Sequence, residues 1–396
     1  MTTPSGRLAT RWLAALEGEL PRARRLRWRI HAEPRLSHRE HDTAVAVAAA
    51  MDAGLEPVDA SAARVGLLPG AAPEAIALRA ELDALPVEEA SGSPHAAVGG
   101  VMHACGHDVH LAALTAVVRA AAGLELPYAL APVLQPSEES YPSGALALLR
   151  SGVLERLGVR RAVAAHVHPG VAPGAVAAGA GVINAAADEL RIRLEGSGGH
   201  GAYPHRASDA VAPIAAIALG LPELVRRTVD RMSPALVSIG TLSAGSGAAN
   251  VLPGSASLLA TVRTSDEGER RTLLAAIERF SRAHAAAYGL LARVELVAGE
   301  PVLRNDPRLA AEVRRLLPRL GLAAAEPLRS LGADDFSYFS EALPSIMMFT
   351  GVRTPGAAPE PSLHDPRFLP PDDAVDAVAR TLLTGYLAAV ETLRAP

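Results

Sequence analysis

The sequence contains no lysine and only one cysteine among its 396 residues. Arginine is therefore the only long basic side chain, a bias that we attribute to genomic base composition and not to function. A single cysteine excludes an internal disulfide bond. The net charge of −4 is spread along the chain and forms no basic stripe, which argues against nucleic acid as a partner.

Long apolar runs are also missing. No stretch approaches the length of a membrane span, and the N-terminal 25 residues have no continuous apolar segment of the signal-peptide type. We therefore expect a cytoplasmic protein that makes no membrane contact. The length is sufficient for two domains of ordinary size.

Two kinds of pattern divide the chain. At both ends, apolar strands alternate with amphipathic helices, which predicts an α/β domain with a largely parallel sheet. The expected strands are 75–82, 128–136, 160–167 and 345–350, and the expected helices are 7–31, 38–54, 110–124, 143–158, 307–320 and one from 372.

The middle of the chain has a different order. Strand 189–196 is followed by helix 207–228, strands 235–242 and 255–263, helix 267–288 and strand 291–298. This β-α-β-β-α-β order is typical of a ferredoxin-like α+β sandwich. We therefore expect one domain formed by 1–184 and 299–396, with a smaller domain, 185–298, inserted.

The cysteine lies in an unusual setting. Cys105 stands in "GVMHACGHDVH" (100–110), with His103, His107 and His110 close by. In an extended segment, residues 103, 105 and 107 would point to one face. Thiolate and imidazole are metal ligands, but a Cys–His nucleophile pair and an inert buried thiol are alternative interpretations.

Other polar residues follow apolar strands, where open α/β sheets usually bind ligands. Adjacent Glu138 and Glu139 come after one strand, so one carboxylate could bind a metal while the other acts as a base. Asp83 follows another strand, His166 ends a third, and His364 lies in a polar loop. Each of these residues alone would be interpreted as a turn, cap or surface residue.

Together, the motifs resemble the dinuclear metal amidohydrolases, a family that includes aminoacylases, hippurate hydrolases, auxin-conjugate hydrolases and N-acetyl-diaminopimelate deacetylases. The resemblance covers residues 25–390 and rests on ordered motifs: "HAEPRLSHREHDTA", "ELDALP", "GVMHACGHDVH", "QPSEE", "AHV", "GSGGHGAYPH", "NVLP", "TVRT", "GADDFSYF" and "LHDP". It implies a zinc-peptidase-like catalytic domain with an inserted lid or dimerisation domain.

The resemblance also implies roles for individual residues. Two divalent metal ions would be bound by Cys105, His107, Glu139, His166 and His364. Zn²⁺ is the expected metal, with Mn²⁺, Co²⁺ or Ni²⁺ as alternatives. Glu138 would be the general base, and Asp83 would orient a metal-binding histidine. His200 would reach the active site of a partner subunit in a homodimer, and Asn250 and Arg263 would hold the substrate carboxylate.

The implied reaction is metal-dependent hydrolysis of the amide bond of an N-acyl amino acid or a related small amide. A dipeptidase or carboxypeptidase with the same site is the main alternative; a non-catalytic metal-binding homologue and a Cys-dependent acyl transferase are weaker ones. The sequence departs from the family pattern at four positions. Arg35 stands where the family usually has Glu, Glu81 where it has Asp, Ser137 where Ala is common, and His168 where an aromatic or small residue is frequent. These departures bear on the choice of substrate and not on the implied metal ligands.

Overall fold

The computed structural model describes residues 4–245 and 247–394. Contacts divide the chain into two compact units. The first is built from the chain up to Ile183, from Arg304–Leu328 and from the chain after Tyr338. The second comprises Asn184–Leu303 and Arg329–Ser337. The segment Arg329–Ser337, which the sequence pattern grouped with 299–396, is bound to the second unit by a bridge between Asn184 and Ser330.

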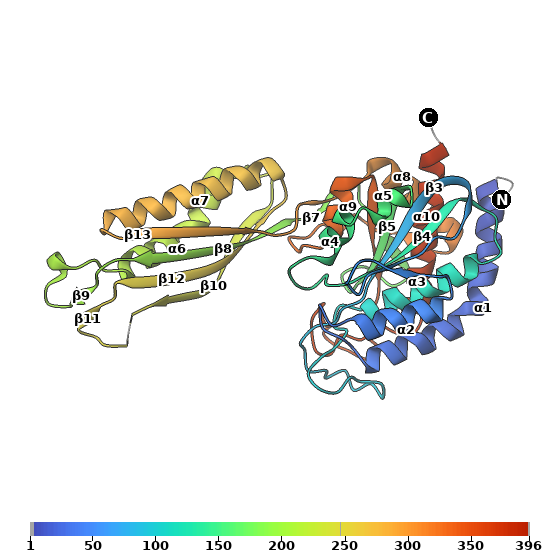
Figure 1. Ribbon diagram of the computed structural model, residues 1–396, viewed down its shortest axis with the longest axis horizontal. Helices are drawn as coiled ribbons and strands as arrows, with labels where there is room; N and C mark the ends of the chain where they lie inside the picture. Colours follow the sequence, from blue (N-terminus) through green and yellow to red (C-terminus); the bar gives the residue numbers. More distant parts are fainter. Residues whose placement is uncertain (1–3, 246, 395–396) are drawn as a thin grey trace. The chain divides into compact units, whose positions relative to one another are not determined.

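A mixed, largely parallel sheet forms the centre of the first unit (Figure 1). Among the described residues it has eight strands in the order β1-β2-β4-β3-β5-β16-β6-β15. The four central strands are mutually parallel: β4 (Leu126–Gln135), β3 (Gly70–Glu81), β5 (Val159–His168) and β16 (Ser345–Gly351). The predicted α/β fold class is confirmed.

Helices bury one face of this sheet. α1 (Pro4–Ala32), α3 (His107–Ala121) and α10 (Ala374–Arg394) contact one another and pack against the apolar side chains that alternate along the strands. Because successive side chains of a strand point to opposite faces, Ile76, Leu78 and Ala80 of β3 join this core. The intervening Arg79 and Glu81 point to the other face.

The parallel arrangement decides where polar residues meet. β3, β4 and β5 run in the same direction, so the segments that follow Glu81 and Gln135 and the end of β5 at His168 lie at one edge of the sheet. Asp83, the Glu138–Glu139 pair and His166 therefore belong to one region of the first unit. We refer to it as the carboxyl edge.

The second unit has the predicted split βαβ order. β8 (Ala186–Glu195), α6 (Val211–Thr228), β10 (Ala235–Ala244), β12 (Ser255–Thr264), α7 (Glu267–Ala287) and β13 (Leu291–Ala298) follow one another along the chain. Their antiparallel sheet has the order β10-β12-β8-β13. In β8, Leu190, Ile192 and Leu194 are buried, whereas Arg191 and Arg193 are exposed. The ferredoxin-like prediction is confirmed.

Two local expectations are wrong. Residues 143–158 do not form one helix but two, α4 (Gly144–Arg150) and α5 (Val153–Arg156), because Gly152 adopts a left-handed conformation with φ 70°. Residues 103–107 are not extended; they form a turn that leads into α3.

The remaining elements are shorter or peripheral. They are α2 (His41–Met51), β1 (Glu56–Pro57), β2 (Arg64–Val65), β6 (Ala175–Ala177), β7 (Gly181–Asn184), β9 (Gly199–His200), β11 (Val251–Leu252), β14 (Leu303–Asn305), α8 (Pro307–Leu316), β15 (Ala323–Ala324), α9 (Phe336–Ala342) and the 3-10 helices Pro204–Arg206 and Leu317–Leu320. Within the described chain, no helix combines the length and apolar character that a membrane span requires.

Candidate metal centre and active site

Cys105, His107 and Glu139 converge at the carboxyl edge. The thiol sulfur, a ring nitrogen and a carboxylate oxygen of these residues all lie within 4.8 Å of one another. Cys105 and His107 are buried, and Glu139 is nearly so. The turn at 103–106 brings the thiol and the imidazole together, whereas Glu139 comes from the loop after β4.

His107 is the first residue of α3, and its orientation is fixed by one hydrogen bond. Its Nδ1–H donates to the carbonyl oxygen of Asp83 at 2.8 Å. This bond directs Nε2 toward Glu138 and Glu139, whose nearest oxygens are each 3.9 Å away. Nε2 is buried and makes no hydrogen bond. A buried imidazole nitrogen directed at two carboxylates is the arrangement expected of a metal ligand.

Gly106 makes this helix start possible. Its φ is 82°, and an added Cβ would lie 2.4 Å from Cγ2 of Val167. Only glycine adopts this conformation without strain and allows the turn to pack against β5. The close packing places Cys105 beside His166.

Asp83 contributes through two different groups. Besides the carbonyl bond to His107, its carboxylate oxygen Oδ2 accepts the backbone N–H of Glu139 at 2.9 Å and the hydroxyl of Ser37 at 2.7 Å. The other oxygen, Oδ1, lies 3.7 Å from His107 Nδ1. Asp83 therefore links a candidate metal-binding histidine to the loop that carries the glutamate pair.

His166 and His364 complete the candidate ligand set. The Nδ1–H of His166 donates to the Val167 carbonyl at 2.7 Å, so Nε2 faces Cys105 Sγ, 3.4 Å away. His364 Nε2 lies 3.5 Å from Glu139 Oε1, and the His364 backbone N–H donates to the Ala104 carbonyl. The structure thus brings all five candidate ligands to one place.

Burial controls the protonation of the thiol. It raises the pKa of Cys105 well above its usual range, and the charges of Glu139 and Glu138 raise it further. Burial also lowers the pKa of His166, with the nearby His110 adding to the effect. Without a cation the thiol is neutral, and a bound divalent metal would convert it to thiolate.

The residues present fit a metal centre. Cys105, His107, Glu139, His166 and His364 supply sulfur, imidazole nitrogen and carboxylate oxygen, the donor types that bind zinc and related divalent metals. Five donors exceed the four of a single tetrahedral site, so the set is compatible with two ions. Glu138, adjacent to Glu139, is positioned beside the ligands.

His110 and Glu81 were missed as parts of this site. The Nδ1–H of His110 donates to Glu81 Oε2 at 2.9 Å, and its Nε2 accepts the Val167 N–H at 3.0 Å. Both ring nitrogens are therefore used, so His110 supports the strand that carries His166. The buried guanidinium of Arg79 pairs with Glu81. The sequence did contain a signal for His110, because residues three apart on a helix, such as His107 and His110, lie on the same face.

His200 and Asn250 lie close together in the second unit. β9 pairs with β11, so His200 is opposite Val251, and the Gly201 N–H donates to the Asn250 carbonyl at 2.8 Å. The His200 side chain is exposed. Both residues lie near the start of β12, because β11 directly precedes that strand along the chain.

Arg263 lies near the other end of β12. It is eight positions after Ser255, which corresponds to on the order of 25 Å along a strand. Its Nε–H donates to Thr261 Oγ1 at 3.1 Å. The structure therefore does not bring Asn250 and Arg263 of one chain together.

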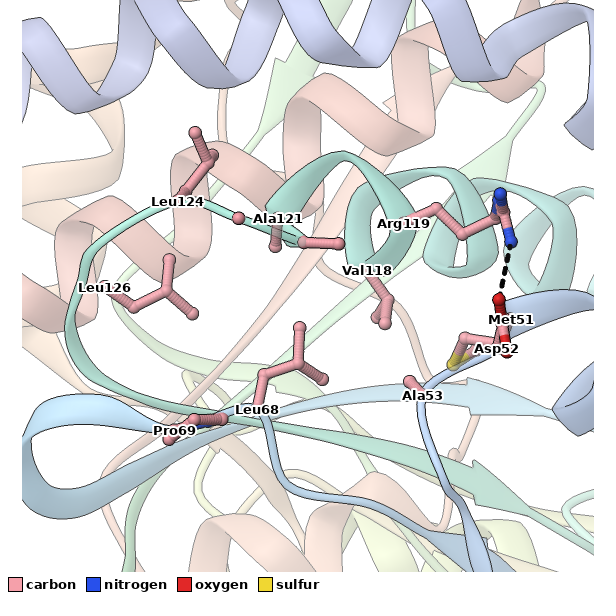
Figure 2. A pocket seen from close by; sticks show the side chains of 12 residues that line it. Met51, Asp52, Ala53, Leu68, Pro69, Val118, Arg119, Ala121, Leu124 and Leu126 are labelled. Atoms are coloured by element: carbon pink, nitrogen blue, oxygen red, sulfur yellow. Dashed lines mark ion pairs between the residues drawn. The ribbon is translucent and has the colours of Figure 1, made fainter.

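A separate pocket lies at the opposite edge of the sheet (Figure 2). It has a volume of about 280 Å³ and lies between the end of α3, the end of α2 and the start of β4. Its walls are mostly aliphatic, including Leu68, Val118 and Leu126, with Arg119 and Asp52 3.9 Å apart at its side. None of the candidate ligands lines it, so it is not the active site.

The sequence as a whole matches a known family. The model of peptidase family M20/M25/M40 matches residues 77–384. The chain belongs to this family. The family predicted from the ordered motifs is thereby confirmed, as is the expectation of a metal-dependent hydrolase that cleaves amide bonds.

Individual M20 relatives agree in sequence and fold. The chain is 32% identical over 348 residues to an N-acetyl-L-cysteine deacetylase of Bacillus subtilis (strain 168), covering 86% of this chain and 82% of the relative. A putative aminohydrolase from methicillin-resistant Staphylococcus aureus superposes with a TM-score of 0.89 at 26% identity, covering 96% and 98% of the two chains.

A third relative bears on the metal. The crystal structure of a Bacillus subtilis protein described as a dinuclear metal-binding peptidase of the M20 family superposes with a TM-score of 0.81 at 26% identity, covering 95% and 99% of the chains. A two-metal site in this M20 chain is compatible with that description and with the ligand set at the carboxyl edge.

Proposed function

We propose that this chain hydrolyses the amide bond of N-acyl amino acids, releasing a carboxylic acid and an amino acid. The observation that carries the proposal is the position of Glu138. Its carboxylate lies 3.9 Å from His107 Nε2, next to the Cys105–His107–Glu139 cluster. The deacetylase relative supports the choice of substrate class.

The chemistry follows from the donor set. Two divalent ions held by Cys105, His107, Glu139, His166 and His364 would polarise the amide carbonyl and acidify water. Glu138 would take a proton from the attacking water and pass it to the leaving amine. Asp83 would keep His107 and the glutamate loop in register through its carbonyl and its carboxylate.

Zinc is the metal that we propose first, because thiolate and imidazole are its preferred ligands. Manganese, cobalt and nickel bind related sites, and affinity order alone does not decide which metal a protein holds. The cytoplasmic location expected from the sequence stays a prediction.

A homodimer through the second unit is the arrangement that we propose. β10 is an edge strand of its sheet, and it exposes Ile239 and Leu242. Unpaired edge strands are ready to pair with another chain. In a symmetric dimer, His200 and Asn250 of one subunit could serve the site of the other, while Arg263 serves its own. This division agrees with the separation of Asn250 and Arg263 along β12.

The first test is chelation and reconstitution. Protein treated with a chelator should lose amine release from N-acetyl amino acids and regain it with added Zn²⁺ or Mn²⁺, with two ions bound per chain. Full activity in metal-free protein would exclude the proposed chemistry. A parallel assay with dipeptides addresses the alternative, because a dipeptidase or carboxypeptidase would release amine faster from dipeptides than from N-acetyl amino acids.

A further inference from the structure

A short segment of the N-terminal region, Ser37–Glu40, supports the loop that carries Glu138 and Glu139. We refer to this segment as the clamp. It follows a contact in which the Ala84 N–H donates to the Arg35 carbonyl, and it ends where α2 begins. It supports the glutamate loop on both sides of Glu138, through Asp83 on one side and by direct contact with Ser137 on the other.

The first point lies after Glu138. The Ser37 hydroxyl donates to Asp83 Oδ2 at 2.7 Å, and the same oxygen accepts the Glu139 N–H at 2.9 Å. Asp83 is fully buried. Ser37 thereby fixes the acceptor of the Glu139 amide.

The second point lies before Glu138. Oε1 of Glu40, a residue that is only 1% exposed, accepts the Ser137 N–H at 2.8 Å and the Ser137 hydroxyl at 3.1 Å. On the other side of the loop, the Gly144 N–H donates to the Ser137 carbonyl. The amides on both sides of Glu138 are therefore anchored to buried carboxylates.

His38 and Ser137 form a reciprocal contact within this arrangement. The His38 N–H donates to the Ser137 hydroxyl oxygen at 3.1 Å, and His38 Nδ1 lies 3.1 Å from the same atom. His38 Nε2 lies 3.1 Å from the Tyr141 carbonyl, which can only accept, so Nε2 carries a hydrogen. The single hydroxyl hydrogen of Ser137 is donated to Glu40 Oε1, because a carboxylate can only accept. His38 therefore holds the loop through its backbone N–H on the Ser137 oxygen and through Nε2 on the Tyr141 carbonyl.

Both residues of this contact have left-handed backbone conformations. φ is 66° at His38 and 52° at Ser137, a region that non-glycine residues rarely adopt. Such conformations persist where surrounding interactions determine them, and they concentrate at functional sites. The Ser137 hydroxyl is the group that joins the two, because it accepts the His38 N–H and donates to Glu40.

We propose that His38 and Ser137 are positioning residues for Glu138. They fix the direction of its carboxylate by holding the turn from which it projects. This inference rests on the proposed function, in which Glu138 is the base. It assigns no contact with substrate or metal to His38 or Ser137.

The test uses five variants of the full chain loaded with Zn²⁺: Ser137→Ala, His38→Ala, His38→Asn, Ser143→Ala and Glu138→Gln. Ser137→Ala and His38→Ala should each lower kcat roughly 10-fold, because small displacements of a catalytic group have large effects on rate. KM and the bound metal per chain should stay within about twofold of wild type, since ligands and pocket are unchanged. His38→Asn should recover most of the rate, because asparagine tolerates this φ, keeps the backbone N–H on Ser137 and places a polar group near the Nδ1 position.

Ser143→Ala is the matched control. Ser143 is also buried in the same loop, and its hydroxyl caps α4 by accepting the Leu146 N–H. This variant should lose stability and keep kcat. If Ser143→Ala lowers kcat as much as Ser137→Ala, the loss reflects loop packing in general and the proposal is overturned.

Hydrogen exchange provides a readout that does not depend on activity. The peptide that contains residues 136–141 should exchange faster in Ser137→Ala and His38→Ala than in wild type, and at the wild-type rate in His38→Asn. Unchanged exchange would overturn the clamp even in a protein without turnover. If Glu138→Gln is inactive but Ser137→Ala and His38→Ala keep the kcat of the wild type, the positioning role is overturned and the proposed function stands. Normal turnover of Glu138→Gln would instead overturn the proposed function.

Discussion

At the residue scale, two adjacent glutamates have different surroundings and different proposed roles. A carboxylate oxygen of Glu139 lies 3.5 Å from His364 Nε2 and within 4.8 Å of the donor atoms of Cys105 and His107. Burial alone would raise the pKa of Glu139, but the contact with His364 and the charge of His107 lower it, which favours the carboxylate. The neighbouring Glu138 also lies 3.9 Å from His107 Nε2.

Separate substitutions distinguish the two roles. Glu138→Gln should retain both metals and the affinity for substrate but lose kcat by roughly 10²–10⁴, the usual contribution of a positioned proton-transfer group. Glu139→Gln should lose metal. Metal analysis and steady-state kinetics on both variants decide the matter, and equal metal loss in the two would contradict the assignment.

Cys105 predicts a release of protons when metal binds. Because burial raises the pKa of the thiol, the metal-free protein holds this proton near neutral pH and must release it to form a thiolate. Metal affinity should therefore rise with pH. Titration calorimetry in buffers of different ionisation enthalpy should show about one proton fewer released by Cys105→Ser than by wild type. The same proton release in both proteins would exclude thiolate ligation.

At the scale of elements, a buried ionic network joins α1 to the start of α3. Arg27 and His31 of α1 both contact Asp108 Oδ2 at 3.1 Å, and the other ring nitrogen of His31 lies 3.1 Å from Glu89. Burial alone would lower the pKa of His31, but the hydrogen bonds and charges of Asp108 and Glu89 raise it to about 9. The network therefore holds Asp108, the residue directly after His107.

This pKa predicts how stability depends on pH. The folded-state pKa of His31 lies above the ordinary value of 6.5, so its contribution is complete below pH 6.5 and disappears as the pH rises through about 9. The difference in unfolding free energy between wild type and His31→Gln should fall by on the order of 3 kcal/mol over this range. Denaturant unfolding of metal-free protein at a series of pH values measures it.

The exposed His41 provides a control for this measurement. His41→Gln should leave the pH dependence of the wild type unchanged. If the stability curves of wild type and His31→Gln run parallel between pH 6 and 10, the imidazolium of His31 does not stabilise the network.

At the scale of the whole molecule, the proposed dimer would determine how the second unit takes part in catalysis. His200 and Asn250 lie together at one end of β12, and Arg263 lies near the other. One chain cannot direct all three side chains of its second unit at a single small substrate. The proposed dimer resolves this by exchanging His200 and Asn250 between subunits.

Complementation tests this exchange. His200→Ala and Glu138→Gln chains should each be nearly inactive alone. In a mixed dimer, one site then carries both defects and the other carries neither, so up to about half of the wild-type activity per dimer should return. The measurement is amine release after confirmed subunit exchange. A mixture that stays inactive would show that His200 acts within its own chain or has no catalytic role.

Local patterns were sufficient for most elements. The limits of β13 and the start of α7 agree with the prediction because both depend on neighbouring residues. Apolar and polar residues alternate along β13, and the Asp266 side chain caps the first turn of α7. The break at Gly152 and the turn before His107 were not predicted, since each depends on a glycine with positive φ that packing selects. A local pattern cannot show which glycines adopt that conformation.

The sequence by itself determined the family, the reaction class and the residue types at the site, because ordered motifs preserve the donors that the chemistry requires. Only the tertiary structure decided how those donors are held. The Asp83 carbonyl orients His107, Glu81 and His110 support the strand of His166, and Ser37–Glu40 contacts a loop about 100 residues later. These contacts join distant segments, and hydrogen-bond partners of that kind follow from the path of the folded chain.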